Sequence, residues 1–390
     1  MHILEAYSAN TRLKINKPFI LEYFFPLSFD KYITIQTNGG MPAKDYSYFN
    51  EVTNILKSTL DKENIVILQL GSKNDKPING CFNLINQTSI NQSAYLIKNS
   101  LLHLGIDSIL IHISSGFNKK IVGLYSVSPP SICGPYWGDK ENQILLEPKF
   151  NNRKYAFDPN EYPKPVDSIK PEIIAQSVLK LLNFPYSYPY KSLFFGGLFN
   201  QQVLEGIPNQ TVDLKPLGVD SNFVMRMDIL FNEEFLFKQL QLSKCLIYTD
   251  RPINKDLIRA AKPQIQEVIY ELNEHNSWPD YIEFLQELGV KFTLLSYCSD
   301  EIINKLKLDY FDYGIIHKRD QNPPKEIEGI DKEKIYYKTN RYILSNQKIY
   351  TSLAALKENR PVSNFGNNIE KIPNDSEFWK EKDFIYLLEK

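Results

Sequence analysis

The sequence predicts an α/β protein of two domains, each built on a parallel β-sheet flanked by helices. Strand-like and helix-like segments alternate along the chain, which is the order that produces parallel sheets. The chain has 390 residues, enough for two domains of ordinary size. With 43% hydrophobic residues it can also fill the cores that two domains need.

The first half of the chain carries the clearer alternation. The run IVILQL at residues 65–70 is continuously apolar, as expected for a strand buried on both faces of a sheet. Further strands are predicted at residues 32–37, 81–85, 101–105 and 121–125. Apolar residues at helical spacing predict helices at residues 46–60, 91–100, 108–117 and 171–182, the last with Pro171 in its first turn.

The second half repeats the pattern after segments rich in Pro and Tyr at residues 128–170 and 183–191. Strands are predicted at residues 244–249, 290–297 and around 360–362, and helices at 255–272, 281–288, 300–307 and 349–356. We therefore predict an N-terminal extension packed on a domain at residues 1–30, a first domain at 31–185, a linker at 186–215 and a second domain at 216–390.

Composition excludes few partners but disfavours some. Lys and Arg total 45 and Asp and Glu 46, and they are interspersed, so no basic stripe for nucleic acid is evident. The four cysteines are widely spaced, which favours reduced thiols in a cytoplasmic protein. No apolar run approaches the roughly 18 residues of a membrane span, and the start of the chain does not resemble a signal peptide. The high aromatic content, 13%, fits compositional bias or a sugar-binding surface.

Ligands of open α/β sheets bind beyond the carboxyl ends of strands, where helix N-termini present N–H groups. Asp107 ends a predicted strand, and Ser108 follows as the predicted cap of the next helix. His112 lies four residues after Ser108, on the same helix face. These residues offer a carboxylate for ribose hydroxyls, a helix end for phosphate and an imidazole. Lys44 could reach the same phosphates from the opposite wall.

Each of these features also has a structural explanation. An Asp-Ser pair often only begins a helix, and a histidine on an apolar helix is often a core residue. Asn38, Gly39 and Gly40 are typical of a simple turn. The order and spacing of the features are more specific than any one of them.

The run IDSILIHISSGFNKKIVGLYSVSPPSICGP at residues 106–135 resembles the heptosyltransferase family, glycosyltransferase family 9. That family has Asp-Ser/Thr-Gly-Pro-x-His, then a helix, a strand ending in Phe-Gly, Thr-x-Pro and Gly-Pro. The positions that match without a gap are Asp107, Ser108, His112, Tyr125, Ser128, Pro130, Gly134 and Pro135. Segments 38–44, 83–97 and 168–182 are similar to further family segments, so the resemblance covers residues 31–182.

The resemblance implies a GT-B fold, in which two Rossmann-like domains face each other across a cleft. It implies that residues 31–185 bind a nucleotide-sugar donor, although the donor half comes second in the family. In this reading the diphosphate or ribose contacts Lys44, Asp107, Ser108 and His112, the loop of Asn38, Gly39 and Gly40 carries Lys44, and Thr88 lies near the base. Two positions depart from the pattern: Ile109-Leu110 replaces Gly-Pro, and Ser72-Lys73 stands where an acidic residue is frequent.

The second domain is the predicted acceptor side. Asp250 follows the strand KCLIYT, where a general base is expected, although a turn or cap role is the commoner one for an Asp in this position. Ser345, Asn346 and Lys348 repeat the layout of strand, cap and helix, as ligand-facing residues or as part of a packed helix.

The predicted activity is glycosyl transfer of the hexosyl or heptosyl type to an unidentified glycan, lipid-linked or other acceptor. No DxD-like pair is evident, so transfer without metal or cofactor is expected. The alternatives are a GT-B-like nucleotide-sugar epimerase and a non-catalytic nucleotide- or carbohydrate-binding protein.

Overall fold

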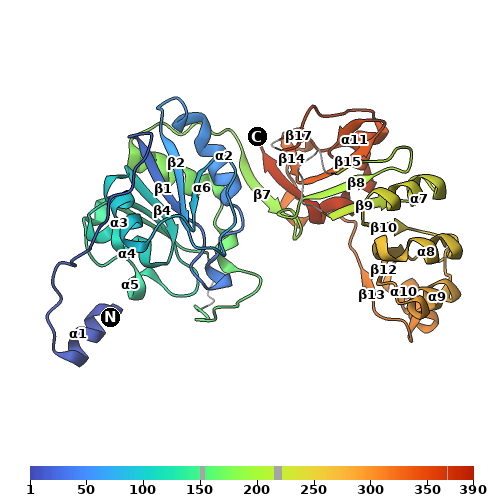
Figure 1. The fold of residues 1–390 in the computed structure, drawn as a ribbon, viewed down its shortest axis with the longest axis horizontal. Helices are drawn as coiled ribbons and strands as arrows, with labels where there is room; N and C mark the ends of the chain where they lie inside the picture. The colour runs from blue at the N-terminus through green and yellow to red at the C-terminus, as the bar shows by residue number, and fades with distance from the viewer. Residues whose placement is uncertain (150–153, 215–221, 367) are drawn as a thin grey trace. The chain divides into compact units, whose positions relative to one another are not determined.

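The computed structural model describes residues 1–149, 154–214, 222–366 and 368–390. The chain divides into two compact units, Met1–Pro189 and Tyr190–Lys390 (Figure 1). The division falls within the Pro- and Tyr-rich segment at residues 183–191. The cleft between domains stays a prediction, and each unit is described by itself.

In the described part of the first unit, parallel strands form one sheet in the order β3-β2-β1-β4-β5-β6. Their bounds are β1 Tyr32–Gln36, β2 Val66–Gly71, β3 Phe82–Ile85, β4 Leu102–Ile106, β5 Lys120–Leu124 and β6 Gln143–Leu146. The first five strands confirm the prediction. The short β6 was missed because it lies in the irregular segment at residues 128–170.

The helices of this unit cover both faces of the sheet, because strand order runs one way from β1 to β3 and the other way from β4 to β6. On one face α2 and α6 pack together, and on the other α3 and α4 do. The main helices are α2 Phe49–Leu60, α3 Ile90–Asn99, α4 Ile109–Gly116 and α6 Pro171–Leu182. The short elements are α1 Ile3–Thr11, η1 Pro42–Lys44, α5 Pro130–Cys133, η2 Lys140–Asn142 and η3 Pro165–Ser168.

The large sheet of the second unit has the order β13-β12-β11-β10-β9-β8-β15-β16, with only the last pair antiparallel among its described strands. The strands are β8 Val203–Gly206, β9 Asn222–Arg226, β10 Cys245–Thr249, β11 Ile265–Glu271, β12 Phe292–Ser296, β13 Ile316–Lys318, β15 Arg341–Ser345 and β16 Lys348–Tyr350. The helices that connect β9 to β13 are α7 Glu233–Leu242, α8 Lys255–Ala261, α9 Pro279–Leu288 and α10 Asp300–Tyr310.

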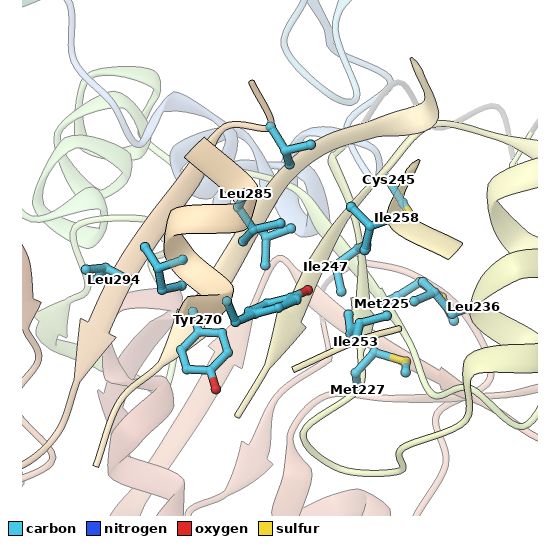
Figure 2. Packing of buried hydrophobic residues seen from close by; sticks show 14 of the residues in the cluster. Met225, Met227, Leu236, Cys245, Ile247, Ile253, Ile258, Tyr270, Leu285 and Leu294 are labelled. Atoms are coloured by element: carbon cyan, nitrogen blue, oxygen red, sulfur yellow. The ribbon is translucent and has the colours of Figure 1, made fainter. Parts of the chain in front are cut away.

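From β8 to β13 each new strand lies next to the preceding one, always toward the same edge of the sheet. Right-handed connections therefore bring α7, α8, α9 and α10 to one face of the sheet (Figure 1). The core lies between this face and these helices. Figure 2 shows Met225, Ile247 and Tyr270 of the strands packed against Leu236, Ile258 and Leu285 of the helices. The short α11 (Leu353–Lys357) packs on the opposite face at β15 and β16, where Ile343 and Tyr350 contact Ala355.

A smaller antiparallel sheet, which the sequence did not predict, completes the second unit in the order β17-β14-β18-β7. Its strands are β7 Lys191–Phe195, β14 Ile335–Thr339, β17 Glu370–Lys371 and β18 Ile385–Glu389. The remaining helices are η4 Lys262–Gln264, η5 Lys325–Ile327, η6 Lys332–Lys334, α11 Leu353–Lys357 and η7 Ser376–Phe384. The predicted α/β class with parallel sheets holds, but it omits this sheet.

Several predictions in the second half are wrong, beginning with one helix and the linker. The helix expected at residues 255–272 ends at Ala261, and β11 begins at Ile265, because Pro263 cannot continue a helix. The linker expected at residues 186–215 contains β7 and the fully buried β8. The predicted boundary at residues 215–216 lies outside the described residues.

Candidate functional site

The candidate site of the first unit lies where strand order reverses, between β1 and β4. Connections leave these strands toward opposite faces, and a crevice forms beyond their carboxyl ends. The loop after β1 approaches β4 closely at Gly39. A Cβ on Gly39 would lie 3.1 Å from Cδ1 of Ile106 and 3.3 Å from the carbonyl oxygen of Asp107. Glycine therefore permits this approach.

The same loop is a tight turn followed by η1, which carries Lys44. The Asn38 side chain accepts a hydrogen bond from the Gly40 N–H at 2.7 Å, and Gly40 has a φ of +75°. Asp45 accepts one from the Gly39 N–H at 3.2 Å. The predicted turn at Asn38, Gly39 and Gly40 is thus present, and it holds the loop in a defined shape.

Lys44 and Asp107 contact each other directly. The Lys44 Nζ lies 2.6 Å from Oδ2 of Asp107, and the two side chains are only 13% and 9% exposed. The same ammonium donates to the Asp107 carbonyl oxygen at 3.4 Å. The two residues predicted on opposite walls therefore meet, and in the structure the carboxylate already neutralises the lysine.

Ser108 occupies the cap position of α4, but it does not cap the helix as predicted. Its hydroxyl donates to the side-chain oxygen of Gln36, the last residue of β1, instead of accepting from a helix N–H. Gln36 takes the place of the helix N–H as the partner of the Ser108 hydroxyl. It can do so because β1 and β4 are neighbouring strands, so the amide oxygen of Gln36 lies beside the start of α4. The first N–H groups of α4 consequently have no side-chain cap and face the reversal point.

His112 lies one turn further along α4 and is partly buried. Burial lowers the pKa of its imidazole, while the negative charge of Asp107 acts in the opposite direction. The ring is therefore neutral at physiological pH and can donate or accept a hydrogen bond.

Two further residues surround Asp107. The Cys133 thiol donates to Oδ2 of Asp107 at 3.6 Å, and burial raises the pKa of this thiol to about 11. Tyr125 directly follows β5 and is fully buried, and its hydroxyl has no hydrogen-bond partner among the described residues. The position of Cys133 in the family-like motif was the only sequence signal for its contact with Asp107.

Thr88 does not join this cluster. It follows β3, and β2 and β1 lie between β3 and β4 in the sheet. Its hydroxyl pairs with that of Ser93 at 2.9 Å, at the start of α3. It shares the carboxyl edge of the sheet with the other residues, which leaves its role near a base a prediction.

In the second unit, Asp250 follows β10 at the carboxyl edge of the sheet, as predicted. Both of its carboxylate oxygens bind the adjacent Arg251, at 2.8 and 3.1 Å. The Asp250 side chain is 30% exposed and that of Arg251 52%, so the pair lies at the surface. Asp250 thus has the predicted place, with a cation beside it.

Glu271 is a second acidic residue at this edge, and the sequence analysis missed it. It is the last residue of β11, which was predicted as helix. The Tyr248 hydroxyl donates to Oε2 of Glu271 at 2.6 Å, and burial raises the pKa of this carboxyl. The guanidinium of Arg226 lies 4.7 Å from the centre of the Tyr248 ring.

The prediction of a second ligand-facing motif at residues 345–348 is wrong in its secondary structure. Asn346 and Gln347 have φ angles of +48° and +60° and form the two-residue turn between β15 and β16. The Ser345 hydroxyl accepts from Asn209 at 2.9 Å, and Lys348 donates to Asn359 at 3.3 Å. The helix begins only after Ser352, and residues 360–362 contribute one isolated bridge at Val362.

Among the described residues no group of three or more His, Cys, Asp or Glu side chains is placed to hold a metal ion. Transfer without metal stays a prediction. None of the helices in the described ranges is long and apolar enough to cross a membrane.

Comparisons with known proteins give the following matches. The solved structure of the Escherichia coli ADP-heptose lipopolysaccharide heptosyltransferase II is 18% identical over 46% of this chain and 51% of that one, with a TM-score of 0.32. A family 9 glycosyltransferase from Veillonella parvula is 17% identical over 40% and 46%, with a TM-score of 0.33. The iron-containing glycosyltransferase TibC from enterotoxigenic E. coli is 13% identical over 43% and 50%, also with a TM-score of 0.33.

This chain thus spans about half the length of the heptosyltransferase structures that it matches. No curated protein sequence matches it. The family model of glycosyltransferase family 9 (heptosyltransferase) matches residues 8–156, which include β1 to β6 and the Lys44–Asp107 pair. Residues 8–156, which are less than half of the chain, are therefore similar to glycosyltransferase family 9 (heptosyltransferase).

Proposed function

We propose that the first unit binds a nucleotide-diphosphate sugar and that the protein transfers the sugar to an acceptor. The observation that carries the proposal is the cluster at the reversal of strand order. There Lys44, Asp107 and the uncapped start of α4 lie together, within the segment that matches the family 9 model.

The cluster suits a diphosphate because its cation contacts Asp107, next to the start of α4, where the first N–H groups have no side-chain cap. A phosphate oxygen would replace the Asp107 carboxylate at the Lys44 ammonium and accept hydrogen bonds from the first N–H groups of α4. Once released from Lys44, Asp107 could accept hydrogen bonds from ribose hydroxyls. The neutral imidazole of His112 would add one uncharged donor.

Transfer also requires a base that accepts the proton of the acceptor hydroxyl. We assign this role to Asp250, which lies at the carboxyl edge of its sheet. Arg251 would have to release the carboxylate for this step, because it now holds both oxygens. Phosphate charge would be balanced by Lys44 and the helix end, without metal. A cytoplasmic location fits the four cysteines, all of which are free.

The direct test is incubation with nucleotide sugars, beginning with ADP-heptose, the ligand of the TibC structure that resembles this chain. Release of free nucleotide that depends on an added acceptor would support the transferase. An altered sugar on the nucleotide would instead indicate an epimerase. Binding in calorimetry without turnover would indicate a non-catalytic binding protein.

Two variants test whether the cluster is the binding site. Ser108→Phe fills the space before α4 and should abolish ADP binding in calorimetry. His112→Ala removes one neutral donor and should weaken ADP binding by up to about tenfold, since such a hydrogen bond contributes about 0.5–1.5 kcal/mol. The matched control is Ser58→Phe, an exposed serine near the end of α2, which leads to the opposite edge of the sheet. If both site variants bind ADP like the wild type, the proposed donor site is wrong.

A further inference from the structure

The N-terminal strap, defined as residues 12–30, crosses the face of the first unit that carries α3 and α4. The inward side chains Ile20, Phe25, Leu27 and Phe29 pack against the core of that face. Polar contacts hold the strap as well: Lys98 pairs with Glu22 at 2.5 Å, and the Trp137 side chain donates to the Asn16 carbonyl at 3.1 Å. The strap is therefore a fixed part of the surface.

The outward side of the strap is apolar too. Phe19 is 90% exposed, Leu21 47%, Tyr23 53% and Phe24 69%. A segment with one buried side normally places polar residues on the other, which faces water. Contiguous exposed apolar groups of this kind mark a surface that binds something.

The charge around this apolar row is positive. Residues 6–21 contain no Asp or Glu but include Arg12, Lys14 and Lys17. Beside the strap is a cavity of about 540 Å³, which Lys17 and Lys98 line together with Phe117 and Trp137. None of the described residues that line this cavity is acidic, although Lys98 also forms an ion pair with Glu22. The surface thus combines exposed aromatic rings with a cationic recess.

This combination matches an anionic phospholipid surface. Aromatic and aliphatic side chains enter the boundary between headgroups and acyl chains, and nearby lysines attract the phosphates. A second copy of the chain fits less well, because a symmetric contact would place Arg12, Lys14 and Lys17 against their own copies. We propose that the strap docks on an anionic lipid bilayer, with Phe19, Leu21 and Phe24 in the interface and Lys17 at the headgroups.

Co-sedimentation with vesicles tests the proposal without any enzymatic activity. The full chain should bind vesicles of mixed phosphatidylglycerol and phosphatidylcholine, and it should bind pure phosphatidylcholine far less. Removing Lys14 and Lys17 should weaken binding by about fivefold each, the ratio that corresponds to about 1 kcal/mol per basic residue. Phe19→Ser with Leu21→Ser should weaken it about tenfold or more.

The matched control carries the same kind of change in the second unit. Leu308 and Phe311, at the end of α10, are each 83% exposed, and Leu308→Ser with Phe311→Ser should leave vesicle binding unchanged. Thermal melting should be nearly equal for all variants, because every changed side chain is exposed at the surface. Equal loss in the control pair, equal binding to both lipids, or absent vesicle binding with strap-dependent dimers in light scattering would overturn the proposal.

Discussion

The two units use parallel strands in different orders, and the difference decides where each can form a crevice. In the first unit the order reverses between β1 and β4, and the loops there bring Lys44 to Asp107. In the second unit the order runs one way from β8 to β13 and reverses only between β8 and β15. These two strands are joined by a buried ion pair, in which Arg341 donates twice to Glu205, at 2.6 and 2.7 Å. Arg341 is aligned with Val203, the first residue of β8, so this pair lies within the sheet and not beyond its carboxyl ends.

The comparison teaches that the two strands at a reversal of order can carry a ligand site beyond their carboxyl ends or structural charge within the sheet. The Glu205 network is paired throughout. Arg226 and Arg341 both bind the one carboxylate, and each of these three side chains is at most 8% exposed. Arg226 also pairs with Asp228 at 2.7 Å, and Arg341 with Glu381 at 3.3 Å. Burial opposes ionisation, yet the two arginines lower the pKa of Glu205 to about 2. The Lys44–Asp107 pair lies instead beside an uncapped helix start, where an anion can replace the carboxylate.

The largest expected effect is therefore on stability in the second unit. Glu205→Ala removes the carboxylate that two buried guanidinium groups share, although Arg226 keeps Asp228 and Arg341 keeps Glu381. The change should therefore lower the free energy of unfolding by roughly 3 kcal/mol, the lower end of the range for a broken buried pair. Urea denaturation measures the change. Asp107→Ala removes the carboxylate partner of one lysine and should lower the free energy of unfolding less. A larger loss for Asp107→Ala than for Glu205→Ala would contradict the contrast between the units.

The next effect concerns turnover. Asp250→Asn should keep ADP binding but lower sugar transfer by roughly 100-fold or more, as expected for a lost general base. Glu271→Gln is the matched comparison, since Glu271 ends the neighbouring strand at the same edge. Full activity of Asp250→Asn together with loss in Glu271→Gln would move the base to Glu271.

Glu271 also gives a pH test with a defined sign. Burial raises the folded-state pKa of its carboxyl, so its ionisation opposes folding. Stability linked to the protonated carboxyl is present below the unfolded pKa, which is about 4.3, and is lost as pH rises through the raised folded value. Glu271→Gln should therefore raise the melting temperature at pH 7 and change it little at pH 4. A higher melting temperature at pH 4 alone would contradict this direction.

A smaller effect is expected at Lys44. Lys44→Ala should weaken ADP by about 1.5–3 kcal/mol more than adenosine, because only ADP carries the phosphates that the ammonium would bind. Calorimetry with both ligands measures the difference. An equal loss for ADP and adenosine would place Lys44 outside the phosphate site and would end the contrast between the units.

The sequence predicts the secondary structure of the first unit better than that of the second, and the reason is physical. The strands β1 to β5 were predictable because their apolar runs alternate along the chain with segments that have apolar residues at helical spacing. In the second unit, IQEVIYE has apolar spacing that also suits a helix, and only its pairing with β10 and β12 makes it a strand. The Asn346-Gln347 turn likewise depends on the pairing of β15 with β16.

The candidate site shows the same limit. The loop of Lys44 and the Asp107-Ser108 pair were predicted at the correct edge of the sheet. Their mutual contact was not predicted, nor was the hydrogen bond from Ser108 to Gln36, since both depend on which strands are neighbours. Sequence spacing gives the order of residues along the chain, whereas these contacts join segments 63 and 72 residues apart.

The smallest expected effect compares two buried hydroxyl groups, one in each unit. Tyr125, beside the candidate site, and Tyr270, in the core of the second unit, are fully buried, and neither hydroxyl has a partner among the described residues. A buried hydroxyl without a partner costs about 1–3 kcal/mol, so Tyr270→Phe should stabilise the protein by about 1 kcal/mol. Tyr125→Phe should do the same in the ligand-free protein.

The effects of the two substitutions should diverge when ADP is added. Asp107 lies close enough to act on the pKa of Tyr125, and it is expected to lose Lys44 to the phosphates. The Tyr125 hydroxyl is then available to that carboxylate, and the stabilisation by Tyr125→Phe should shrink, whereas that by Tyr270→Phe should stay constant. Thermal melting of both variants with and without ADP measures this, and an unchanged difference between them would show that Tyr125 is ordinary core.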